Sequence, residues 1–249
     1  MATLDNRRSF LTLAGASAAL VACLPKASGA VASRTPSAEG ASCPPATGDV
    51  DDVSAVEDLM REHGVIRRLL VVYREAANRL RVDRGSVPPS ALHGAASLMQ
   101  NFGEDYHERA LEEAHIFPAV RKAGGPASGL IDTLAAQHQR GREITSYVLS
   151  VSSRGISAGT AEPLAHALEG FARMYEEHAA QEDTVVFQAW KKSQSMPQLL
   201  AAGELFEEIE HKTFGKDGFD DARDKIAFIE QELGMTLAGT LAPPPPPIL

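Results

Sequence analysis

Apolar residues recur three and four positions apart over most of the chain after residue 52, the spacing that places side chains on one face of an α-helix. The first such stretch starts at residue 53 and ends near residue 80, before the breaking segment RVDRGSVPPS. The second runs from about residue 91 to 120, the third from about 130 to 151, and the fourth follows Thr160, its expected N-cap. Four helices of roughly 20 residues or more with short breaks predict an all-α fold, an up-down four-helix bundle.

Two more helical segments follow, over residues 195–215 and 219–235, and we expect them to pack outside the bundle or to cap one of its ends. Residues 31–52 have no apolar period, which predicts a disordered linker. We therefore divide the chain into a bundle over residues 53–192, additional helices over 193–238 and a proline-rich tail over 239–249.

Residues 1–30 are expected to be an export signal rather than part of the fold. Arg7 and Arg8 precede a short Ala/Gly/Leu stretch, which is similar to a twin-arginine signal. The sequence LVAC, ending at Cys23, resembles a bacterial lipobox, although cleavage near Ala30 or Ala32 is the alternative. Both predict an exported protein, either periplasmic or held on the outer side of the cytoplasmic membrane by a lipid on Cys23.

The composition limits the partners and the metal ligands that are expected. The net charge is −9, and no basic cluster extends beyond short arginine pairs, so a nucleic-acid partner is not expected. The chain has only two cysteines, one in the expected signal and one in the linker, so neither a disulfide framework nor a cysteine-based zinc site is expected. Any bound metal must therefore be held by histidine and carboxylate.

The second predicted helix carries acids and imidazoles on its apolar side. Glu108, Glu112 and His115 are four and three positions apart, so they form one stripe. This stripe lies beside Ile116, and we expect it to face inward, whereas His107 is the residue directed most nearly outward.

The other three helices show the same feature. His178 and Glu182 lie in the middle of the apolar stripe of the fourth helix, while His63 and His138 lie on the apolar faces of the first and third. A lone histidine on such a face is usually a core residue, but several buried carboxylates without compensation would cost several kcal/mol each. Convergence from four helices therefore favours a metal site over a metal-free structural bundle. The candidate ligands are His63, Glu108, Glu112, His115, His138, His178 and Glu182.

Three segments, REHGVIRRLL, ALEEAHIFPAV and HAAQEDTVVF, resemble a bacterial hemerythrin-like (HHE cation-binding) domain, over about residues 53–190. The resemblance implies two iron ions inside the four-helix bundle. Carried over by position, His63, His138 and His178 would be terminal ligands, and Glu112 and Glu182 would bridge the ions.

The sequence departs from the family pattern on two helices. Glu108 occupies the position, four residues before the bridging carboxylate, where the family usually has a histidine, and no second histidine accompanies His138. His115 would fill the gap through the Glu-x-x-His spacing that it forms with Glu112. Alternatively, His107 replaces Glu108 as a ligand if a π-bulge distorts the helix.

The expected function is that of an exported protein with two non-haem iron ions that binds dioxygen, NO or peroxide. An oxygen-rich ligand set makes manganese an alternative metal. The rival functions are a carboxylate-rich di-metal oxidase or peroxidase, and metal sequestration or sensing at the cell envelope. The sequence favours a binding protein over an enzyme, since it shows no organic-substrate pocket.

Overall fold

A computed structural model of the chain describes residues 53–235, so the signal, Cys23, the linker and the tail over 239–249 lie outside the described residues. The described part is helical throughout, with no strand in residues 53–235 and no helix there that is long and apolar enough to cross a membrane. The helices are α1 (Ala55–Val82), α2 (Pro89–Leu98), η2 (Met99–Ile116), α3 (Phe117–Ala123), α4 (Ile131–Arg154), α5 (Ala158–Gln181), η4 (Glu182–Val186), α6 (Phe187–Ser193), α7 (Met196–Phe214) and α8 (Gly218–Glu232).

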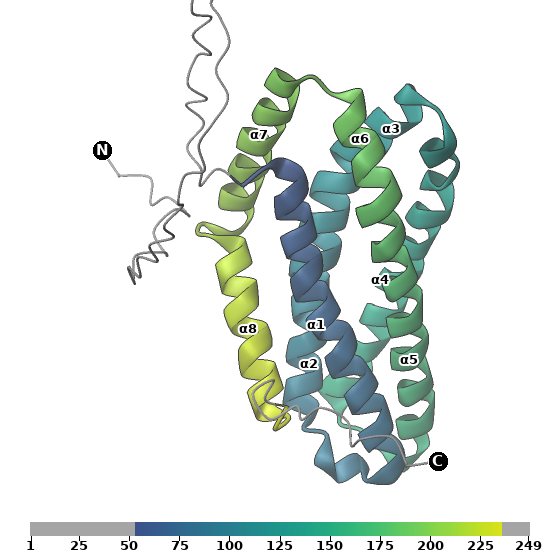
Figure 1. Cartoon of the computed structure of the whole chain (residues 1–249). Coiled ribbons are helices and arrows are strands. Elements are labelled where there is room, and N and C mark those ends of the chain that lie inside the picture. The colour runs from purple at the N-terminus through teal and green to yellow at the C-terminus, as the bar shows by residue number, and fades with distance from the viewer. Residues whose placement is uncertain (1–52, 236–249) are drawn as a thin grey trace, which may run out of the picture. The chain divides into compact units, whose positions relative to one another are not determined.

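Several of these elements join end to end into four long helical rods, which confirms the all-α bundle (Figure 1). The rods are α1, α2–η2–α3, α4 and α5–η4–α6, connected by short turns that include the 3₁₀ segments η1 (Arg84–Ser86) and η3 (Pro126–Gly129). α1 packs on α5 and η2, and α4 packs on α2 and α5, so each rod has two neighbours around one interior.

Local caps explain where the rods begin. Ser54 starts α1, with its hydroxyl accepting a hydrogen bond from the Glu57 amide at 3.3 Å. The cap of α5 is Ser157, and the prediction of Thr160 was wrong. Ser157 and Thr160 form a capping box, because each side-chain oxygen accepts a hydrogen bond from the other residue's amide. Thr160 therefore contributes to the cap from inside the first turn.

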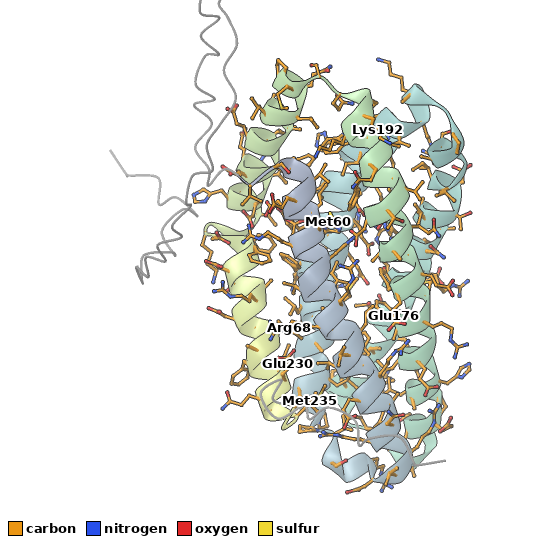
Figure 2. All side chains as sticks on the ribbon, viewed as in Figure 1. Met60, Arg68, Glu176, Lys192, Glu230 and Met235 are labelled. Carbon is orange, nitrogen blue, oxygen red and sulfur yellow. The ribbon has the colours of Figure 1, made fainter. Side chains whose placement is uncertain are left out.

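The two C-terminal helices lie along the side of the bundle rather than across one end. α7 and α8 contact α1, and α8 also packs on α2 (Figure 1). Arg68 of α1 donates two hydrogen bonds to Glu230 of α8, at 2.8 and 2.6 Å, a bidentate pair labelled in Figure 2. Phe214 of α7 packs edge-on against the Tyr106 ring of η2, with centroids 5.2 Å apart. This layer covers the α1–η2 side of the interior, where the polar cluster described next is found.

Candidate metal centre

Two of the rods change from α to π winding over part of their length. The Glu112 carbonyl accepts a hydrogen bond from the Phe117 amide, and the Glu182 carbonyl accepts one from the Phe187 amide. Each bond spans five residues instead of the four of an α-helix, and such π segments are frequent at functional sites. η2 is π-wound over its whole length, Met99–Ile116, so residues five apart share a face there.

Four histidines and two glutamates meet between the rods at this level. Each has an exposed fraction of 3% or less, although all six are polar or ionisable. Their ligand atoms fall into two overlapping groups that lie within metal-binding distance of one another. The six residues are His63 of α1, His107 and Glu112 of η2, His138 of α4, His178 of α5 and Glu182 of η4.

The histidines form two pairs, and each carboxylate reaches both. The His63 and His107 rings are 4.6 Å apart between centroids, and those of His138 and His178 are 4.7 Å apart. Glu112 places Oε1 at 3.3 Å from His107 Nε2 and Oε2 at 3.3 Å from His138 Nε2.

Glu182 also reaches both pairs, but through a single oxygen. Its Oε2 atom lies 3.5 Å from His63 Nε2 and 3.0 Å from His178 Nε2. Two imidazole pairs joined by two carboxylates are the arrangement expected for two metal ions with bridging ligands.

The inward-facing atoms fit a pair of cations. Both oxygens of Glu112, both oxygens of Glu182 and Nε2 of His107 are buried without a hydrogen-bond partner. A buried polar atom without a partner costs about 1–3 kcal/mol, and more if charged, so such a group is expected to have a ligand. His138 and His178 also direct Nε2 atoms at each other across 3.0 Å. Imidazole nitrogen together with carboxylate oxygen suits iron, manganese or zinc.

Each histidine is oriented by an acceptor behind its ring. Every Nδ1 atom faces a side-chain oxygen at 2.6–2.9 Å, so the Nδ1–H donates outward and Nε2 is directed into the interior. The pairs are His63 with Asp183, His107 with Glu62, His138 with Glu113, and His178 with Gln137. Such partners raise the basicity of a ligating imidazole and fix its tautomer.

Two phenylalanines close the cluster on its sides. Phe187 stacks on His63 with centroids 5.3 Å apart, and Phe117 stacks on His138 at 5.4 Å. These are the residues whose amides close the π turns at Glu182 and Glu112. The same arrangement therefore occurs twice. In each case a π turn directs a glutamate inward and stacks a phenyl ring on a histidine from another rod.

The charge state of the two carboxylates in the cluster favours the binding of cations. Burial and the neighbouring Glu182 carboxylate both raise the pKa of Glu112, but His107 and His138 outweigh them and lower it. Burial also opposes ionisation of Glu182, yet His178 and His63 hold its pKa well below the usual value. Both carboxylates are therefore ionised at neutral pH, ready to bind cations.

A family model, that of the hemerythrin HHE cation-binding domain, matches residues 54–190. The chain belongs to the hemerythrin HHE cation-binding family. It is 40% identical over 233 residues to the uncharacterized proteins Mb2018 of Mycobacterium bovis and Rv1995 of Mycobacterium tuberculosis, a span of 92% of this chain and 88% of each relative. No solved structure gives a significant match.

Five of the residues predicted from sequence come together in this hemerythrin HHE domain: His63, Glu112, His138, His178 and Glu182. His115 does not join them. Its ring is partly exposed and lies against Phe206, with centroids 5.9 Å apart, so the ligand role of His115 stays a prediction.

Glu108 is buried next to the cluster, and its hydrogen-bond partners lie outside the six residues. Its Oε1 accepts a hydrogen bond from the Tyr175 hydroxyl at 2.7 Å, and Oε2 accepts one from Arg142 at 3.3 Å. Burial raises the pKa of Glu108 to about 7 in spite of His138 and Tyr175. Glu108 also lies close enough to His138 and Glu113 for the three to hold a metal ion, so its ligand role stays a prediction.

The expectation that His107 points outward was wrong, because the side chain is 1% exposed and faces Glu112. The sequence had offered His107 as a ligand in place of Glu108 if the helix were distorted by a π-bulge. The π winding of η2 is such a distortion, and it turns His107 toward the interior. The acceptors Glu62 and Asp183 were missed, although each is adjacent in sequence to a cluster residue.

Proposed function

We propose that this chain is an exported hemerythrin-like protein in which two non-haem iron ions bind dioxygen or a related small molecule, NO or peroxide. The arrangement that supports this is the buried set of four imidazole Nε2 atoms around two carboxylates whose four oxygens have no hydrogen-bond partner. Manganese fits the same donors and is the alternative metal. The export part of the proposal rests on the sequence of residues 1–30, with Cys23 as the candidate anchor.

The bound ions would supply redox chemistry and an open coordination position for the ligand. The protein holds them with His63, His107, His138, His178, Glu112 and Glu182. A narrow gap opens on the α1–η2–α5 side of the cluster, between the apolar side chains of Ile66 and Ala179 and the polar groups of Glu108 and Tyr175. The gap is too small for an organic substrate in this structure.

A second candidate function, a di-metal oxidase or peroxidase, is favoured by the polar side of this gap. Tyr175 and Glu108 add a hydroxyl and a carboxyl group to the lining of the gap. Such groups can exchange protons with a reduced oxygen species.

The test is the visible spectrum of the iron-loaded protein, reduced with dithionite and then exposed separately to air, NO and hydrogen peroxide. A band that forms with oxygen and disappears under argon supports reversible binding. Irreversible oxidation supports the oxidase or peroxidase. A protein that takes up iron but changes with none of the three ligands contradicts both. The His63→Ala variant is the matched control and should lose most of each band.

A further inference from the structure

Tyr175 lies beside the metal cluster in the interior of the bundle. It belongs to α5, three residues before His178, and its side chain is 2% exposed. The ring centroid is 5.3 Å from that of His178 and 4.3 Å from that of Phe171, on which it stacks. Tyr175 also lines the narrow gap beside Glu112 and Glu182. An electron leaving this ring would reach a metal ligand across a single van der Waals contact.

The hydroxyl of Tyr175 occupies a space that depends on the missing side chain of Gly141. A Cβ atom at Gly141 of α4 would lie 2.0 Å from the hydroxyl oxygen, so no larger residue fits there without moving Tyr175. The hydroxyl donates to Glu108 Oε1 at 2.7 Å, and Arg142 holds the second oxygen of that carboxylate. A phenol that loses an electron becomes a strong acid, so an acceptor already hydrogen-bonded to it makes the loss easier. Tyr175 has this acceptor.

The chain has four tyrosines, and the other three lack one or more of these features. Tyr73 is in edge contact with Phe171, with centroids 5.2 Å apart, but its buried hydroxyl has no hydrogen-bond partner to take the proton. Tyr106 donates to Glu62 at 3.0 Å, but its ring packs against Phe102 and Phe214, and it does not line the gap. Tyr147 is 36% exposed.

We propose that Tyr175 is a redox-active residue that gives one electron to the metal centre when a peroxide is reduced there. Peroxide accepts two electrons and two protons, its O–O bond breaks, and two molecules of water form. One electron comes from the metal pair and the other from Tyr175. The phenol O–H bond breaks, its proton moves to Glu108 Oε1, and a neutral tyrosyl radical remains; the protons that form water come from solvent. This inference rests on the proposed metal centre and specifies peroxide as its ligand class.

The test is electron paramagnetic resonance of the full-length, iron-loaded protein, frozen within seconds of mixing with hydrogen peroxide. The wild type should give a radical signal that narrows when the protein is made with ring-deuterated tyrosine. Tyr175→Phe should lower the signal at least tenfold, whereas Tyr73→Phe, Tyr106→Phe and the exposed control Tyr147→Phe should keep it. Iron content is measured for every sample.

Gly141→Ala provides a second variant that leaves the phenol in the chain. It should keep its iron and lose most of the radical, because the added methyl group displaces the hydroxyl from Glu108. A wild-type signal that does not narrow with the label, or a signal that survives Tyr175→Phe at full iron content, overturns the proposal. Wild-type protein that binds iron and consumes peroxide without any radical also overturns it. Wild-type protein without iron contradicts the proposed function itself.

Discussion

Replacing Glu112 by glutamine tests whether this carboxylate bridges two ions. Glu112 places one oxygen 3.3 Å from His107 Nε2 and the other 3.3 Å from His138 Nε2, and neither oxygen has a hydrogen-bond partner. Glutamine keeps the size and shape of the side chain but loses the charge and one acceptor. If Glu112 is a shared ligand, the substitution weakens the binding of both metal ions while leaving the packing of η2 unchanged.

The magnitude follows from linkage between binding and folding. Loss of groups that only orient a metal ligand costs 10–100-fold in affinity, and loss of a shared ligand should reach at least the upper figure. A hundredfold weaker affinity lowers the metal-dependent part of the free energy of unfolding by about 2.7 kcal/mol for each ion affected. This part is the difference between the unfolding free energies with and without metal. Changes that Glu112→Gln causes in the metal-free protein therefore cancel.

The assay is urea unfolding of wild type and Glu112→Gln, each with a fixed excess of ferrous iron under argon and again with chelator. Glu176→Gln is the matched control, because Glu176 is exposed and its partner Arg74 lies on the surface. It should change the free energy of unfolding by less than about 0.5 kcal/mol in either condition. An equal gain from metal in wild type and Glu112→Gln would refute the bridging role.

Three more predictions follow from the surroundings of the cluster. Glu62→Gln should weaken metal binding about 10–100-fold in chelator competition, because an amide cannot accept from both Tyr106 and His107; unchanged affinity would contradict the orienting role. His115→Ala should leave the metal content unchanged, and loss of metal would support the ligand role predicted from sequence. Hydrogen bonds with His138 and Arg142 outweigh burial and hold the pKa of Glu113 at about 2, below its ordinary 4.5. Because the pKa of Glu113 is lower in the folded protein than in the unfolded chain, its contribution to the free energy of unfolding should be complete above pH 4.5 and be lost as the pH drops toward 2. In the metal-free protein, Glu113→Gln should make the free energy of unfolding by urea less dependent on pH in this range.

The periodicity of apolar residues was sufficient to predict the bundle and much of the cluster. His178 lies on α5 and Glu182 directly after its last residue, so a period of 3.6 places both in the interior, and the same period identified Glu112 as buried. The α-helical period failed along η2, where hydrogen bonds span five residues and His107 and Glu112 share a face. An α-helical projection places Glu108 and His115 there instead.

The orienting acceptors were not predictable because each acts across the bundle. Glu62 precedes His63 in sequence but accepts from His107 of η2. Asp183 follows Glu182 but accepts from His63 of α1. The sequence shows that these acids are adjacent to candidate ligands, whereas only the packing of the rods determines which imidazole each one contacts.

Metal content is the most direct measure of the central claim. The protein should be purified from cells grown with iron, and its iron and manganese measured by inductively coupled plasma mass spectrometry together with the absorption spectrum. The account predicts about two metal ions per chain, with loss of most of this metal in the double variant Glu112→Ala and Glu182→Ala, the two shared carboxylates. Folded wild-type protein that holds no stoichiometric metal, even after reconstitution with ferrous iron or manganese, would contradict it.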